Sequence, residues 1–167
     1  ISAFPTMTMV CNPSITLAER ENQLLQIVAG ISPGADFNNT ATAQGKAFDW
    51  LVNVDPAQVC PEEQLDVVQR YVLALLFYET NGSNWTFCTP NPVESTCPFM
   101  GEDRFLTAGS VCQWINITCA DPEDANSDIV EIVLPSNNLS GEIPDELSAL
   151  TQLATLDLMD NCLIGTI

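Results

Sequence analysis

Two stretches near the carboxyl end decide how this chain folds: IVEIVLPSNNLSGEIP at residues 129–144 and LATLDLMDNCLIGTI at residues 153–167. Seven positions of the first stretch match the second at a constant offset of 24 residues. The matched pairs are Ile129 with Leu153, Ile132 with Leu156, Leu134 with Leu158, Asn137 with Asn161, Leu139 with Leu163, Gly141 with Gly165 and Ile143 with Ile167. This pattern of apolar residues and asparagine is typical of a repeat with one short strand per turn of a right-handed coil.

Alternation along each strand predicts which side chains face the interior of such a coil. Ile132 and Leu134 are expected to point inward, and Asn137 is expected to turn the chain by bonding backbone groups with its amide. The residues expected to close the turn from the opposite wall are Leu139, Ile143, Leu147 and Leu150. The candidate binding face consists of the outward residues Glu131, Val133, Thr155, Asp157 and Met159.

Three helices are expected upstream of the repeat, from apolar residues at helical spacing and from end signals. They span residues 16–30, 41–54 and 61–80. Thr16 and Glu19 form a capping-box pattern at the first. Pro61, Glu62 and Glu63 suit the first turn of the third. Residues 85–128 are expected to be loop-rich, and the core is the expected place for Trp50, Trp85 and Trp114.

The acidic excess of the chain limits its partners. Of its 167 residues, 22 are Asp or Glu and only 4 are Lys or Arg, which gives a net charge of −18. The basic residues are scattered along the chain: they are Arg20, Lys46, Arg70 and Arg104. Nucleic acid is therefore not an expected partner. A basic protein, a cation or a neutral glycan fits this charge better. The longest strongly apolar run, residues 71–78, is too short to span a membrane.

The cysteines and asparagines favour an extracellular location. Seven cysteines in a chain without histidine favour disulfides over a His-containing zinc site or a Cys-His nucleophile pair. N-glycosylation acceptors of the N-x-S/T type occur at Asn38, Asn81, Asn84, Asn116 and Asn138. We therefore expect N-linked glycans and a protein that is secreted, at the cell surface or in the cell wall.

Two motifs resemble those of plant-type leucine-rich repeat proteins. NLSGEIPDEL at residues 138–147 is similar to the N-L-S-G-x-I-P-x-x-L segment of that family. CQWINITC at residues 112–119 is similar to the C-x-W-x-G-V-x-C motif of its amino-terminal cap. The two cap cysteines are bonded in the family, which implies a Cys112–Cys119 disulfide. Asn116 replaces the glycine of the motif, and asparagine is the next-best residue for a positive φ.

The remaining cysteines are assigned by spacing and elimination. Cys88 and Cys97 are close in sequence and are expected to pair, which leaves Cys11 for Cys60. Cys162 is then left over. We expect it to be a buried free thiol, with an intermolecular bond or a partner in another repeat as the alternatives.

The upstream half extends the resemblance. QGKAFDWL at residues 44–51 and QRYVLALLFY at residues 69–78 are similar to the helical leader of secreted or membrane-tethered leucine-rich repeat proteins from stramenopile algae. The resemblance implies an α/β fold: the start of a leucine-rich repeat solenoid with parallel β rungs, preceded by an α-helical, disulfide-stapled amino-terminal cap. The expected parts are a helical region at residues 1–84, a disulfide-rich cap at 85–127 and repeats at 128–167, one complete and one truncated.

Neither an active site nor a metal site is expected. Without histidine, acid–base chemistry would depend on carboxylates that the sequence places in solvated loops. The one weak calcium candidate is an acidic loop without EF-hand spacing, formed by Asp121, Glu123, Asp124 and Asp128.

The resemblance implies a non-catalytic protein that binds a protein or glycan, or that mediates adhesion. The alternative is a structural glycoprotein whose copies assemble head to tail into an extracellular fibre or cell-wall layer. This alternative depends on the second repeat, where another coil or another copy must cover Leu156, Leu158 and Leu163.

Overall fold

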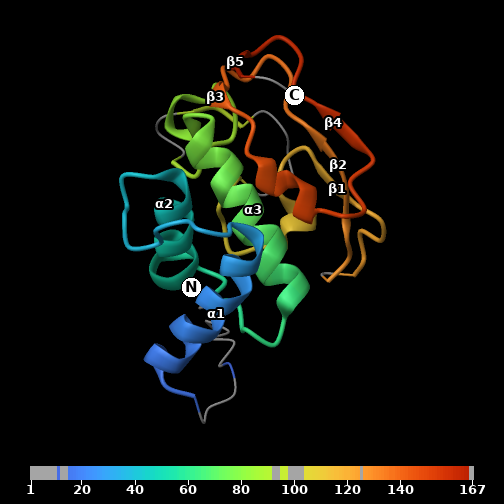
Figure 1. Cartoon of the computed structure of the whole chain (residues 1–167). Coiled ribbons are helices and arrows are strands. Elements are labelled where there is room, and N and C mark those ends of the chain that lie inside the picture. Colours follow the sequence, from blue (N-terminus) through green and yellow to red (C-terminus); the bar gives the residue numbers. More distant parts are fainter. Residues whose placement is uncertain (1–10, 12–14, 92–94, 98–103, 125, 166–167) are drawn as a thin grey trace, which may run out of the picture.

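The computed structural model describes residues 11, 15–91, 95–97, 104–124 and 126–165 of the chain. Helices α1, α2 and α3 lie together in one part of the molecule, and the short strands lie beside α3 in the other part (Figure 1). The helical elements are α1 (Leu17–Ile31), α2 (Ala43–Asp49), the π-helical turn η1 (Trp50–Val54), α3 (Gln64–Glu79) and the 3-10 turns η2 (Gly82–Asn84), η3 (Val111–Gln113) and η4 (Asp145–Ala149). The strands are β1 (Ile117–Cys119), β2 (Ile129–Val133), β3 (Ser140–Glu142), β4 (Thr155–Asp157) and β5 (Cys162–Ile164). Disulfides join Cys11 to Cys60, Cys88 to Cys97 and Cys112 to Cys119.

Helix α1 is held by its cap and by one buried stripe. Thr16 Oγ1 accepts a hydrogen bond from the Glu19 N–H at 3.2 Å, and the Glu19 carboxylate accepts one from the Thr16 N–H at 2.7 Å. This is the capping box expected from the sequence. The buried residues, spaced four apart, are Arg20, Leu24 and Val28. Arg20 donates two hydrogen bonds to the Val59 carbonyl oxygen, which ties α1 to the segment before α3.

The second expected helix forms as α2 followed directly by the π-turn η1, and it stops before Asp55 as predicted. Thr42 Oγ1 accepts a hydrogen bond from the Gly45 N–H at 3.1 Å and caps α2. A Cβ atom on Gly45 would collide with the Asn39 carbonyl oxygen, so glycine allows this close approach. At the other end, the Asp55 N–H donates to the Trp50 carbonyl oxygen at 2.7 Å, a bond across five residues that is typical of a π-turn.

Helix α3 runs through the centre of the molecule (Figure 1). It begins at Gln64, so the expectation that Pro61 to Glu63 form its first turn is wrong. Those residues form a separate turn: the Glu63 N–H donates to the Cys60 carbonyl oxygen at 2.9 Å, and the Glu63 carboxylate accepts from the Cys60 N–H at 3.3 Å. Every residue from 69 to 77 is buried, because α3 is covered on all sides.

The two copies of the repeat lie side by side in parallel. β2 is the central strand of a sheet with the order β1-β2-β4, in which β1 is antiparallel and β4 parallel to β2. Glu131 is paired with Thr155, an offset of 24 residues (155 − 131) that equals the repeat period. β3 and β5 form a second parallel pair, with Ser140 opposite Cys162. The fold is thus mixed helix and sheet, with the repeat pairing to itself.

The Cys112–Cys119 segment does not form a hairpin of its own. Cys112 lies in the 3-10 turn η3, and Cys119 ends β1, whose partner is β2. The two cysteines are seven positions apart in sequence, which leaves room for one turn and one strand but not for two paired strands. Between them Asn116 has a φ of +60°, the positive value that the sequence predicted.

One buried core joins the helices, the cysteine-rich segment and the repeat. Arg70 lies between two indole rings, with its guanidinium carbon 5.6 Å from the ring centre of Trp50 and 5.0 Å from that of Trp114. The same guanidinium forms a buried ion pair with Asp55. Trp50, Trp85 and Trp114 are all buried, as expected. The helices and the repeat therefore share one core, and the helices stabilise the repeat by packing directly against it.

Candidate binding surfaces

The strand face consists of the outward side chains of the three-stranded sheet and the turn after β4: Thr118, Glu131, Val133, Thr155, Asp157 and Met159. Thr118, Glu131 and Thr155 form one row across the three strands. The Thr118 hydroxyl donates to a Glu131 carboxylate oxygen at 3.3 Å. The inward row beneath is Ile117, Ile132 and Leu156. The structure thus brings the five expected residues together and adds Thr118, which the alternation of residues 117–119 could have revealed.

Asn161 holds the two coils in register beneath this face. Its Oδ1 accepts hydrogen bonds from the N–H groups of Asn137 at 3.0 Å and Leu139 at 2.9 Å. Its Nδ2 donates to the carbonyl oxygens of Leu134 at 2.8 Å and Leu158 at 2.9 Å. One half-buried amide therefore satisfies four backbone groups from both copies of the repeat, so it fixes the spacing of the strand face.

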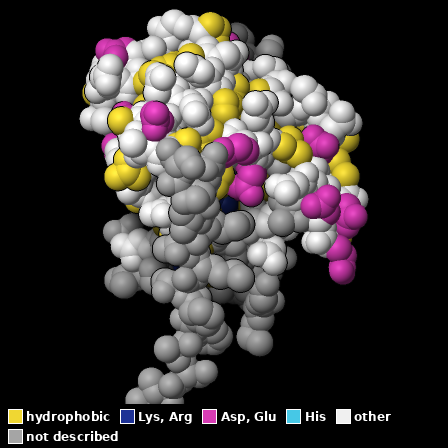
Figure 2. Space-filling model, turned by 90° about the horizontal axis from the view of Figure 1, so that it is seen from below, with side chains coloured by type: hydrophobic (Ala, Val, Ile, Leu, Met, Phe, Trp, Pro, Cys, Tyr) yellow, Lys and Arg dark blue, Asp and Glu magenta, His cyan; other side chains and the backbone are white. Residues whose placement is uncertain are grey.

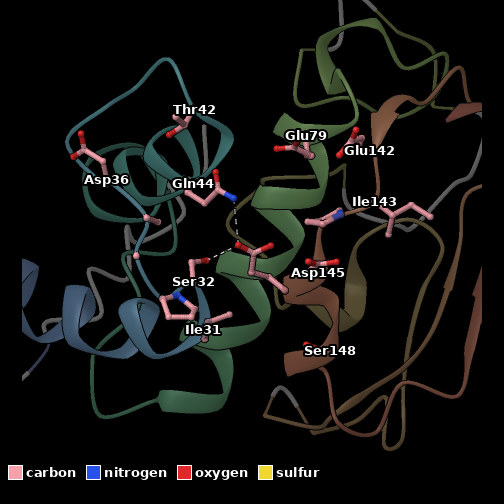
Figure 3. A pocket seen from close by; sticks show the side chains of 15 residues that line it. Ile31, Ser32, Asp36, Thr42, Gln44, Glu79, Glu142, Ile143, Asp145 and Ser148 are labelled. Carbon is pink, nitrogen blue, oxygen red and sulfur yellow. Dashed lines mark hydrogen bonds between the residues drawn. The ribbon is translucent and has the colours of Figure 1, made fainter. Parts of the chain in front are cut away.

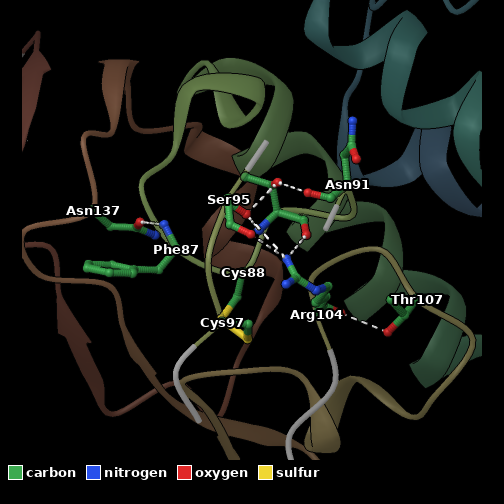
Figure 4. The surroundings of a disulfide bond; sticks show 9 residues. Phe87, Cys88, Asn91, Ser95, Cys97, Arg104, Thr107 and Asn137 are labelled. Atoms are coloured by element: carbon green, nitrogen blue, oxygen red, sulfur yellow. Dashed lines mark hydrogen bonds between the residues drawn. A yellow bond between two sulfur atoms is a disulfide. The ribbon is translucent and has the colours of Figure 1, made fainter. Parts of the chain in front are cut away.

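Asn137 makes the equivalent contact to a segment 50 residues upstream. Its Oδ1 accepts from the Phe87 N–H at 2.8 Å (Figure 4), so the amide bonds a backbone group as expected, and that group lies outside the repeat. Cys88 follows Phe87 and is bonded to Cys97. Arg104 donates to two carbonyl oxygens inside this disulfide loop. The stapled loop therefore covers one edge of the first copy of the repeat.

A cavity of about 780 Å³ lies between the helical part and the first repeat (Figure 3). Its acidic lining residues are Asp36, Glu79, Glu142, Asp145 and Glu146. Glu146 accepts hydrogen bonds from the Ser32 hydroxyl at 2.8 Å and from the Gln44 amide at 3.2 Å. Burial raises the pKa of Glu79, and the negative charges of Glu146 and Glu142 raise it further. These carboxylates favour a cationic group over an anion. Sequence patterns could not reveal this cavity, because Ser32 and Glu146 are 114 residues apart.

Acidic side chains also outnumber basic ones on the face shown in Figure 2. There they are scattered among hydrophobic and uncharged side chains, and almost no basic side chain is visible. Two of the four basic residues, Arg20 and Arg70, are buried. Their burial removes positive charge from a surface that already has little.

The acidic loop after β1 is arranged by its own hydrogen bonds. Asp121 Oδ1 accepts from the Glu123 N–H at 3.0 Å, and Asp124 Oδ1 accepts from the Asn126 N–H at 2.9 Å. Asp121, Glu123 and Asp124 are exposed, and Asp128 is half-buried. Among the residues that the structure describes, no group of three or more His, Cys, Asp or Glu side chains is placed to hold a metal ion. Calcium binding by this loop stays a prediction.

The modification sites differ in exposure. The exposed sequon asparagines are Asn38, Asn81, Asn84 and Asn138, whereas Asn116 is half-buried. Cys162 is a free thiol on β5 and is exposed, so the expectation of a buried thiol is wrong. The reason is strand alternation, because the adjacent Leu163 is the residue that packs against the core.

Comparison with known proteins gives one partial similarity. No protein-family model matches the chain, and no solved structure matches it. The chain is 41% identical over 49 residues to a probable leucine-rich repeat receptor-like protein kinase of Arabidopsis thaliana. This similarity covers 29% of the chain and 5% of the kinase, and it indicates leucine-rich-repeat-like character for part of the chain. Closeness to stramenopile proteins stays a prediction.

No helix within the described ranges combines the length and the apolar character that crossing a bilayer requires.

Proposed function

We propose that the chain is an extracellular leucine-rich repeat module that binds a protein partner and has no catalytic activity. The observation that carries this proposal is the parallel pairing of β2 with β4 at the repeat period, with Glu131 and Thr155 adjacent on the solvent side. Repeat proteins use such surfaces because equivalent positions of successive coils stand side by side and form one continuous contact area. The similarity to a receptor-like kinase supports the same class of function.

In this proposal the paired repeats are the first rungs of a solenoid, and everything before them forms its cap. The contact of Asn137 with Phe87 covers one edge of the first rung. The hydrogen bond between Ser32 and Glu146 attaches the helical part to its turn. A solenoid needs such a lid because its terminal coil would otherwise expose apolar side chains. Three disulfides are compatible with the proposed extracellular location.

The partner that fits best is a protein with a basic contact surface. The net charge of −18 and the burial of Arg20 and Arg70 leave the chain with an overwhelmingly negative exterior. Glu131 lies at the centre of the strand face, between Thr118 and Thr155. Complementary charge would speed the encounter and select against acidic competitors.

Charge reversal at the centre of the strand face tests the proposal. Three tagged proteins are compared: wild type, Glu131→Lys and the control Glu62→Lys. Each is displayed on the producing cells and cross-linked to the proteins bound to it. The bound proteins are then identified by mass spectrometry. Both variants change the charge equally, but Glu62 is an exposed residue in the turn before α3 and does not belong to the strand face. We expect Glu131→Lys alone to lose the captured partner. The same partners on all three proteins, with melting temperatures unchanged, would refute the strand-face assignment.

Exposed apolar residues favour a second candidate function, a structural subunit that assembles head to tail. On and near β4 and β5, Leu156 is 40% exposed, Met159 63% and Ile164 66%. A contact between this surface and a different surface of the next copy is heterologous and can propagate into a fibre. Electron microscopy of concentrated protein, with and without a calcium chelator, tests this candidate. Ordered fibres would support it, and dispersed particles in both conditions would refute it.

A further inference from the structure

Three of the five sequon asparagines lie together, although they come from segments 54 residues apart. Asn138 Nδ2 donates a hydrogen bond to the Asn84 carbonyl oxygen at 2.8 Å. Asn84 Nδ2 donates to Asn81 Oδ1 at 2.9 Å. Asn81 Nδ2 donates to the Ser140 hydroxyl at 3.2 Å. Ser140 is the hydroxyl residue of the Asn138 sequon, so these bonds join the acceptor residues into one connected group.

This group lies over the seam between the end of α3 and the first repeat. The backbone crosses the seam next to it, where the Ser140 N–H donates to the Thr80 carbonyl oxygen at 3.1 Å. β3 begins at Ser140 and lies beside the end of α3 (Figure 1). Asn81 and Asn138 have φ values of +58° and +60° and occupy turns, and all three asparagines are exposed. The seam therefore presents three glycan acceptors to solvent from two parts of the chain.

We infer that Asn81, Asn84 and Asn138 form one N-glycan patch over this seam, with glycans on both segments of the same molecule. The inference rests on the extracellular location in the proposed function. None of the three residues belongs to β1, β2 or β4, the strands that carry the strand face.

The hydrogen bonds of the folded protein are compatible with this modification. In the transfer, a bond forms between Nδ2 and the first sugar carbon of a lipid-linked oligosaccharide diphosphate. The bond from that carbon to the diphosphate oxygen breaks, one Nδ2 proton is released, and the lipid diphosphate leaves. An amide nitrogen has two N–H groups, and each patch asparagine uses one in the bonds above, so the folded bonds can persist beside a glycan.

Asn161 shows the opposite arrangement. Its Nδ2 donates to the carbonyl oxygens of Leu134 and Leu158 and uses both N–H groups inside the repeat. It is followed by Cys162-Leu163 and is not a sequon. Asn161 thus uses both of its N–H groups within the fold, whereas the bonds above use one N–H group of each patch asparagine.

The test uses a background in which only the patch can be glycosylated. Thr40→Ala and Thr118→Ala remove the Asn38 and Asn116 sequons without changing those asparagines. The protein is secreted from eukaryotic cells, its intact mass is measured, and glycopeptides are mapped before and after removal of N-linked glycans. We expect at least two glycans per molecule, one on Asn138 and one on Asn81 or Asn84. Adding Ser140→Ala should remove the Asn138 glycan, and Ser140→Thr, which keeps the sequon, should retain it.

The outcomes separate this inference from the proposed function. If the unmodified sequence carries glycans at Asn38 or Asn116 but the background protein carries fewer than two, the patch is refuted and the extracellular location stands. If the unmodified sequence carries no glycan at all, both are refuted. If the Ser140→Ala protein keeps its full glycan mass, Asn138 is not an acceptor and the patch is refuted.

Discussion

Replacing Asp66 with asparagine should stabilise the protein at neutral pH and reduce its dependence on pH. Asp66 lies in the first turn of α3, where burial raises its pKa to about 6. The charge of Arg70 lowers this pKa, and the charges of Asp55 and Glu63 raise it. Asp66 Oδ1 is buried and has no hydrogen-bond partner among the described residues. The ionised carboxylate is therefore less favourable in the folded chain than in the unfolded chain.

The pKa change sets the size and sign of the effect. A rise from 3.8 to about 6 is about two units, which corresponds to roughly 3 kcal/mol of unfolding free energy. The folded chain binds the proton of Asp66 more tightly than the unfolded chain does. This contribution to the unfolding free energy is therefore fully present below the pKa of Asp66 in the unfolded chain, and it is lost as the pH rises through the pKa of Asp66 in the folded chain. Asp66→Asn removes the ionised form, so the variant should exceed wild type by about 2–3 kcal/mol at neutral pH and match it near pH 4.

Urea unfolding without reductant, at several values between about pH 4 and pH 8, measures the difference. Glu62→Gln serves as the control, because Glu62 is exposed and carries the same charge just before α3. We expect the control to track wild type across this range. A gap between Asp66→Asn and wild type that does not grow as the pH rises would contradict the reasoning, whatever its size.

Four further changes test the repeat, its cap and helix α1. Asn161→Ala leaves four backbone groups without their partner and should cost about 2–4 kcal/mol in urea unfolding, with loss of amide protection in β4 by hydrogen exchange. Replacing Cys88 and Cys97 together by alanine opens a loop of nine-residue separation and should cost about 2–3 kcal/mol, measured in the same way. Gly141→Ala should lower the melting temperature strongly, because φ is +113° and the added Cβ meets the Glu79 carbonyl oxygen. Gly30→Ala, in a helix with open space around it, should instead raise stability by about 0.5–1 kcal/mol.

Local patterns in the sequence were enough to predict the repeat and the start of the first helix. The 24-residue period predicted that Glu131 and Thr155 are neighbours, and the parallel pairing of β2 with β4 confirms it. Ile132 and Leu134 are buried, as alternation predicted. The capping box at Thr16 also needed only four consecutive residues. These features depend on residues that are close in sequence or recur at a constant spacing, and such residues can be recognised from the sequence alone.

Contacts between segments that have no common pattern could not be read in this way. The partner of Asn137 is Phe87, and α3 begins after Glu63 because the bonded Cys60 holds a separate turn there. The exposure of Cys162, by contrast, follows from strand alternation beside the packed Leu163, so it did have a local signal.

The sequence by itself determined the repeat, its inward residues, the short disulfides and the acidic character of the chain. Only the tertiary structure decided that the acidic cavity forms between Ser32 and Glu146, and that Asn84 meets Asn138 at one seam. The physical reason is distance along the chain. Periodic and adjacent residues interact through geometry that the backbone imposes locally, whereas residues 54 to 114 positions apart meet only when the whole core has packed.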